Sequence, residues 1–158
     1  MPAPLLPGPR TAPRWSDLLT PDPLSGAHWA SCTRRPELVA CGTAWDAVVI
    51  APLERGLAGL DRLGLPLQAG HPVIADYVRH QLIVLVPAGT GHHCDIPGSR
   101  VLRDGTWLLI PADTHGTAAA TWLSRPHPHT PRLIDAHRLR EALLHAGSSL
   151  GTGTRSLE

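Results

Sequence analysis

The sequence predicts an α+β domain in which helices flank a mixed β-sheet. Short runs of β-branched residues are typical of strands, and two segments carry leucines at helical spacing. The expected order is a helix, strands, a second helix, several mostly adjacent strands, and a last helix. Regular alternation of strands with helices, which would predict a doubly wound parallel sheet, is not seen.

The first half of the domain holds the clearest local patterns. Residues 25–35 are a candidate helix. Residues 37–41 and 45–50 are expected strands, and the second of these ends in three β-branched residues. Pro52 suits the first position of a helix, and Gly64 suits its end. The helical face between them carries Leu53, Leu57, Leu60 and Leu63.

Two apolar segments follow, at residues 71–77 and 81–86. They form either a hairpin across residues 78–80 or two sequential strands. The second segment is apolar on both faces, so we place it centrally in the sheet.

The elements after this pair are shorter. Residues 87–98 are expected to form a loop, and a strand over 100–102 follows it. This strand turns at Asp104-Gly105 into residues 106–110, since Asp-Gly is a favourable hairpin turn. A weaker strand is expected over 117–124.

A last helix is expected to begin at Asp135, a good N-cap, and to end at Gly147. Its apolar face carries Ala136, Leu139, Ala142 and Leu143. Before it, residues 125–132 are a Pro- and His-rich surface loop to which we assign no role. Three tryptophans at or inside expected strands should pack in the core or over the helices, and base stacking is the less favoured alternative. These are Trp45, Trp107 and Trp122.

The prolines and glycines divide the chain into three parts. Residues 1–24 carry seven prolines and form a flexible arm, which Trp15 and the leucines after it can pin to the core. Residues 25–146 make a single domain. Residues 147–158 are a disordered Gly/Ser tail, in which Leu157-Glu158 resembles a cloning remnant.

The composition excludes several classes of protein. The chain has 158 residues and a formal net charge of +1, and its 14 positive side chains are all arginine, as expected for a high-GC bacterium. This balance excludes a strongly basic nucleic-acid binder. No apolar run approaches the ~20 residues that span a bilayer. Prolines interrupt any secretory signal, and three cysteines are too few for a disulfide framework, so we expect a cytoplasmic protein without a membrane partner.

One loop concentrates reactive side chains, with the sequence His-His-Cys-Asp at residues 92–95. Adjacent side chains diverge and no paired ligand spacing is present, so we expect no metal site and no cofactor. We assign no catalytic residue and keep Cys94, His93 and His80 as candidates. A small enzyme would use His92, His93, Cys94 and Asp95 with His80 or His115.

A second group of polar side chains lies near the expected sheet and its loops. If these residues converge on one face, they would bind phosphate or a nucleic-acid backbone; otherwise they are solubilising charges. No phosphate-binding loop and no dinucleotide fingerprint occurs in the sequence. The candidate ligand-binding residues are Arg79, His80, Gln81, Arg100 and Arg103.

Five segments carry a family resemblance, namely CGTAWDAVVIAP, LERGLAGLDRLG, RHQLIVLVPAGT, DIPGSRVLRDGTWLLIPADTHG and TWLS. Over about 100 residues they resemble the bifunctional DNA primase–polymerase (prim-pol) domain. The family's pattern has a strand that ends in acidic residues. It continues with a histidine before a hydrophobic strand and a Pro-Gly turn, and with D-x-R-x-x-G leading into a further strand. The resemblance implies a prim-pol-like α+β fold.

The chain departs from this family where catalytic metals would bind. The carboxylates expected directly after the first strand fall on Ala51 and Pro52. The histidine before the central strand falls on Gln81, one residue after His80, and a later acidic position falls on Arg100. Since Mg²⁺ requires oxygen ligands, the resemblance implies a scaffold without the polymerase site.

The sequence leaves three functional hypotheses open. The first is a non-catalytic binding or regulatory module that recognises a nucleotide, a nucleic acid or a protein partner. The second is a small enzyme built on the His/Cys loop. The third is a homo-oligomeric assembly protein whose Pro-rich arm docks on a second protomer. We favour the first, because the order of segments is kept while the carboxylates are missing.

Overall fold

The computed structural model describes residues 14–19, 37–67, 69–111, 116–127, 129–130 and 132–155. These residues have the predicted α+β fold, with two α-helices, a six-stranded sheet and a separate two-stranded sheet. The candidate helix at 25–35 lies outside the described residues, as do Cys32 and His115. None of the described helices combines the length and hydropathy of a membrane-spanning segment.

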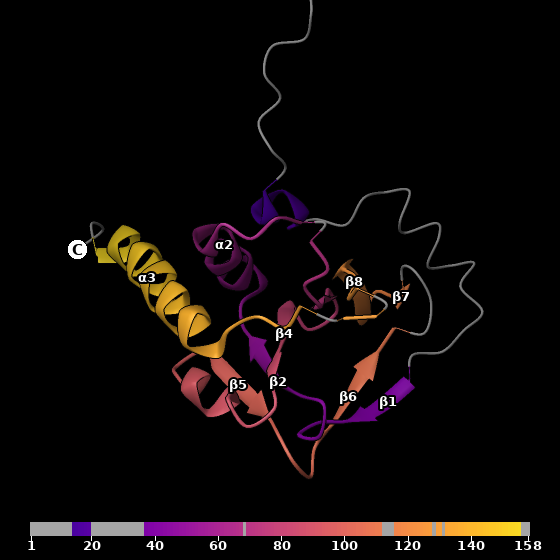
Figure 1. Ribbon diagram of the computed structural model, residues 1–158. Helices are drawn as coiled ribbons and strands as arrows, with labels where there is room; N and C mark the ends of the chain where they lie inside the picture. The colour runs from indigo at the N-terminus through magenta and orange to yellow at the C-terminus, as the bar shows by residue number, and fades with distance from the viewer. Residues whose placement is uncertain are drawn as a thin grey trace, which may run out of the picture.

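The strands are short and form two sheets (Figure 1). Their bounds are β1 (Glu37–Ala40), β2 (Trp45–Ile50), β3 (Val73–Asp76), β4 (Gln81–Pro87), β5 (Ser99–Leu102), β6 (Trp107–Ile110), β7 (Gly116–Thr117) and β8 (Ala120–Ser124). The larger sheet has the order β5-β2-β4-β3-β8-β7, and in the smaller one β1 pairs with β6.

β4 lies inside the larger sheet, as its two apolar faces predict. It forms an antiparallel hairpin with β3, which confirms the first of the two connections that the sequence left open. This hairpin inserts β4 between β2 and β3. Every pair of neighbouring strands in the described part of the larger sheet is antiparallel. The prediction of a mixed sheet is therefore wrong.

Two helices pack together on one face of the larger sheet (Figure 1). The first, α2 (Leu53–Leu63), ends at Gly64, whose left-handed φ of +69° suits a residue without a side chain. Its predicted apolar stripe is buried against alternate residues of β2 and β4. The main core of the domain therefore lies between the two helices and this face of the larger sheet.

The second helix, α3 (Ala136–Arg155), begins where the sequence predicts. The N–H of Arg138 donates to Oδ1 of Asp135 at 2.9 Å, which is an N-cap hydrogen bond. The helix continues beyond Gly147, so the predicted end at that residue is wrong. A glycine inside a helix costs about 1 kcal/mol relative to alanine, and this weakens a helix without forcing it to end.

The N-terminal arm contacts the same face through the short 3-10 helix η1 (Trp15–Leu18). Trp15 is 1% exposed, and its indole N–H donates to the carbonyl oxygen of Leu65 at 2.8 Å. Its backbone N–H donates to Oδ1 of Asp61 at 2.6 Å. The arm is therefore pinned at Trp15, as predicted.

The β1–β6 pair lies against the opposite face of the larger sheet, where Leu108 and Cys41 are buried. β6 pairs with β1 and not with β5, so the hairpin predicted across Asp104-Gly105 is wrong. The turn itself forms, since the N–H of Thr106 donates to the carbonyl oxygen of Arg103 at 3.0 Å. After the turn the chain crosses to the other face of the larger sheet, where β6 pairs with β1. The Asp-Gly signal predicts the turn, but it does not specify which strand β6 pairs with.

Trp107 is 62% exposed, which corrects its predicted place in the core. Successive side chains of a strand point to opposite sides, and in β6 the neighbour Leu108 takes the buried position. Trp45 and Trp122 are half-buried and pack against the core on this face.

Candidate functional site

A groove opens between the β1–β6 pair and the sheet face beneath it, with a volume of about 390 Å³. We call it the ribbon groove. Its floor consists of Val49, Ile83 and Leu102. The β1–β6 pair contributes Leu38, Trp107, Leu108 and Leu109, and the turn before β8 contributes Ala119. The polar lining residues are Asp76, Arg79, Gln81 and Arg100.

The register of the sheet explains why polar residues from three strands meet there. Arg100 of β5 lies opposite Val49 of β2, which in turn lies opposite Ile83 of β4. Gln81 is two residues before Ile83 and therefore on the same face, and it lies opposite Asp76 of β3. From β5 to β3 there are three strand spacings, about 14 Å. Cations at the two sides of the groove can therefore reach a common ligand.

Asp76 fixes the β3–β4 side of the groove. It is 2% exposed, and its Oδ1 accepts a hydrogen bond from the backbone N–H of Arg79 at 2.9 Å. Its Oδ2 accepts from Nη1 of Arg79 at 3.1 Å and from Nε2 of Gln81 at 3.3 Å. The carboxylate thus orients two predicted ligand-binding side chains. Sequence reasoning missed this role, for which the spacing of Asp76 and Arg79 across a turn was the available signal.

Arg100 contributes the second cation from the edge of the sheet. Arg100 is exposed, and none of the ion pairs among the described residues includes it. Since Asp76 offsets one arginine, the lining residues carry one net positive charge. Ala51 directly follows β2, and its N–H donates to the carbonyl oxygen of Gly98 at 2.9 Å, just before β5. Ala51, Gln81 and Arg100 therefore lie at the same end of three neighbouring strands.

The other two predicted ligand-binding residues do not line the groove. His80 has a left-handed backbone, with φ of 55°, and its Nε2 forms a hydrogen bond with Glu54 of α2. Arg103 follows β5 and is exposed outside the groove. The structure therefore brings together Arg79, Gln81 and Arg100, and not all five residues.

Large apolar side chains of the β1–β6 pair remain exposed beside these cations. Leu38 is 63% exposed and lies opposite Leu109, which is 36% exposed. Trp107 is two residues before Leu109, on the same face of β6, and is 62% exposed; it is also a lining residue of the groove. An exposed aromatic residue and arginines that line one groove are a combination that suits a nucleobase and its phosphate. From the sequence alone, base stacking by Trp107 is the less favoured alternative, because this residue is expected to be buried.

The His/Cys loop has the geometry of a structural element. Cys94 lies in the 3-10 helix η2 (Gly91–Cys94), is fully buried, and its Sγ donates to the carbonyl oxygen of Ala136 at 3.1 Å. Burial raises the pKa of Cys94 to about 11, so the thiol is protonated at neutral pH. This argues against Cys94, one of the three candidates, as a reactive thiol.

The histidines near Cys94 do not supply a partner for it. His92 and His93 are exposed, with ring centroids 4.2 Å apart. Within the described ranges, no group of three metal-ligating side chains comes together. Of the two histidines expected to assist this loop, His80 pairs with Glu54 and His115 lies outside the described residues.

Comparison of the chain with known protein families, with curated proteins and with solved structures finds no match. The resemblance to the prim-pol domain therefore stays a prediction.

Proposed function

We propose that this chain is a non-catalytic, prim-pol-like binding module whose ribbon groove recognises a nucleotide unit. The unit is either a free nucleotide or part of a single strand of nucleic acid. The observation that carries the proposal is that Arg100, Arg79 and the exposed residue Trp107 line one groove.

Each part of the groove suits one part of a nucleotide. A guanidinium presents N–H groups in a planar fork that matches the oxygens of a phosphate. An exposed indole stacks on a base of any sequence. The amide of Gln81 donates to Asp76 through Nε2, which leaves its Oε1 as an acceptor for a base or a ribose hydroxyl.

The single carboxylate of the groove supports binding rather than catalysis. Nucleotidyl transfer uses a pair of divalent cations, which need several oxygen ligands. Asp76 is the one carboxylate among the lining residues, and Arg79 and Gln81 already occupy its oxygens. Ala51 and Arg100 offer no oxygen side chain at that end of the sheet.

The charge of the groove predicts modest affinity that depends on salt. Two arginines that neutralise two phosphates of a single strand give an affinity that falls about sevenfold between about 50 and about 200 mM salt. The net charge of the chain, +1, adds little long-range attraction.

The test is a titration of a fluorescently labelled single-stranded oligonucleotide and, separately, of a mononucleotide, at about 50 mM salt. We expect saturable binding of at least one of them. Trp107→Ala should weaken it at least about fivefold, because a stacked base contributes about 1–3 kcal/mol. Val78→Ala is the control, since Val78 is 69% exposed and outside the groove.

The pattern of binding identifies the ligand. A preference for the oligonucleotide assigns a single strand, and a preference for the mononucleotide assigns a free nucleotide. If neither binds at low salt, the proposal is wrong. A protein partner or a second copy of the chain, seated on the exposed apolar side chains of Leu38, Trp107 and Leu109, then becomes the better account.

A further inference from the structure

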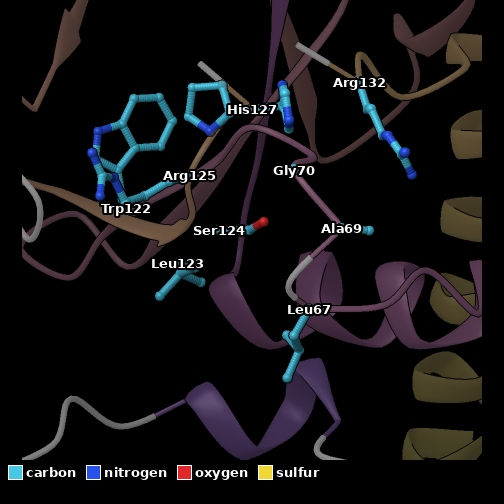
Figure 2. A pocket seen from close by; sticks show the side chains of 10 residues that line it. Leu67, Ala69, Gly70, Trp122, Leu123, Ser124, Arg125, His127 and Arg132 are labelled. Atoms are coloured by element: carbon cyan, nitrogen blue, oxygen red, sulfur yellow. The ribbon is translucent and has the colours of Figure 1, made fainter. Parts of the chain in front are cut away.

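A second and larger cleft lies at the other end of β3, with a volume of about 920 Å³ (Figure 2). The first residue of β3, Val73, lies opposite Ser124, whereas the last residue, Asp76, lies opposite Gln81 in the ribbon groove. The two sites are therefore at opposite ends of the strand. We call this one the Ser124 cleft, after the residue at the end of β8 that lines it.

The cleft is built around the carbonyl oxygen of Gly70. This oxygen accepts hydrogen bonds from the backbone N–H groups of His127 and Arg132, at 3.3 and 3.4 Å. The ring of His71 donates from Nδ1 to the carbonyl oxygen of Arg132 at 2.8 Å. Gly70 has a φ of +88°, and a Cβ on it would lie 3.0 Å from the Cβ of His127. The segment that follows β8 is thus held against Gly70 by two backbone hydrogen bonds.

The lining carries positive charge without a carboxylate. Arg125 and Arg132 line the cleft, and no aspartate or glutamate does. None of the ion pairs among the described residues involves either arginine. An anion is the ligand that such a lining attracts.

A buried hydroxyl at the centre of the cleft has no hydrogen-bond partner. Ser124 is 4% exposed, and its Oγ forms no hydrogen bond with the described residues. Figure 2 shows this residue between the indole of Trp122 and the chain at Gly70. Buried hydroxyls are nearly always paired, so an unpaired one that lines a cleft points to a ligand that supplies the partner.

The remaining lining is apolar, with the half-buried side chains of Trp122, Leu67 and Leu123. The volume is in the range of clefts that hold small organic ligands. We propose that the Ser124 cleft binds a small organic anion that carries a planar ring. The Ser124 hydroxyl and the guanidinium groups of Arg125 and Arg132 bind its phosphate or carboxylate, and the ring packs on Trp122. This inference goes beyond the ribbon groove and does not depend on it.

The experiment titrates the full chain with phenyl phosphate and with benzoate, while the amide and indole N–H signals are followed by NMR. Inorganic phosphate and phenol are the control ligands. We expect at least one aromatic anion to bind at least about tenfold more tightly than either control and to shift the Trp122 indole signal. Binding of phenyl phosphate alone assigns a phosphate ligand, and binding of benzoate alone assigns a carboxylate.

Variants separate a binding role of Ser124 from a structural one. Ser124→Ala should weaken binding about tenfold while the melting temperature stays the same or rises, because the hydroxyl it removes has no partner. Ser99→Ala is the matched control, since the Ser99 hydroxyl is also buried and unpaired but lies outside the cleft. Arg132→Gln, an exposed position, gives a second test in case Ser124→Ala fails to fold.

Three results would overturn the inference. The first is that neither aromatic anion binds at millimolar concentration. The second is that Ser124→Ala and Arg132→Gln both bind as tightly as the unmodified chain. The third is that inorganic phosphate binds as tightly as phenyl phosphate, which would mean a simple anion site. Arg100→Gln should leave this binding unchanged, so the two proposals can fail separately.

Discussion

The guanidinium of Arg79 lies 3.1 Å from the carboxylate of Asp76, across the turn between β3 and β4. Because Asp76 is buried and Arg79 is mostly exposed, the pair satisfies a carboxylate in the core and also holds a cation at the mouth of the ribbon groove. Arg100, on the other side of the groove, has no such anchor within the described residues. The groove thus combines one fixed cation with one free cation.

Asp76→Asn should destabilise the domain by about 2 kcal/mol, because hydrogen bonds to a charged group are replaced by weaker ones in a buried place. Urea unfolding of the two proteins measures the difference. Asp95→Asn makes the same chemical change at an exposed residue and should shift the unfolding free energy by no more than about 0.5 kcal/mol. Equal effects of the two substitutions would contradict the anchoring role.

Trp15→Ala should cost about 3 kcal/mol or more, since the indole is buried in the core and donates to Leu65. Leu19→Ala, four residues later on the same arm, is the control. Leu19 is 38% exposed, so its truncation should cost no more than about 0.5 kcal/mol. Thermal unfolding of both variants checks this, and a small effect of Trp15→Ala would show that the arm does not contribute to the core.

Cys94 and Cys41 should resist thiol reagents in the folded protein at neutral pH. Both are buried, and burial raises the pKa of each thiol. In a Cys32→Ser background, a colorimetric thiol assay should detect little reaction until denaturant is added, and then two thiols per chain. Rapid labelling of Cys94 without denaturant would restore the hypothesis of a reactive thiol.

The same thiol predicts how stability changes at alkaline pH. The pKa of Cys94 is raised from its ordinary 9.0 to about 11 in the folded chain. Between these values the unfolded chain binds fewer protons, so this contribution is fully present below about pH 9 and is lost as the pH rises toward about 11. Unfolding free energies of Cys94→Ala should therefore fall less steeply over this range. Cys41 and Tyr77, whose pKa values are also raised by burial, act equally in both proteins.

The sequence predicted the elements that are defined by contacts between residues close together in the chain. Pro52 and Gly64 bracket α2, and the β3–β4 hairpin joins adjacent strands. The pairing of β6 with β1 was not predictable in this way, because it joins residues about 70 positions apart after a turn that suits a local hairpin. The exposure of Trp107 follows from that pairing and was missed for the same reason.

The candidate site was predicted in part. Arg79, Gln81 and Arg100 were named as ligand-binding residues, and the register of β5 on β2 brings them to one groove. No sequence signal showed that His80 would turn toward Glu54 through a left-handed backbone. The Ser124 cleft was missed because it depends on hydrogen bonds between Gly70 and a loop more than fifty residues away.

The affinity of a nucleotide ligand for Arg100→Gln, compared with Arg103→Gln, tests the ribbon groove most directly. Both substitutions remove one positive charge from an exposed arginine, but only Arg100 lines the groove. If the groove binds phosphate, Arg100→Gln weakens binding about tenfold and Arg103→Gln changes it less than about twofold. Equal losses for the two variants would mean that binding depends on overall charge, and would contradict a site in this groove.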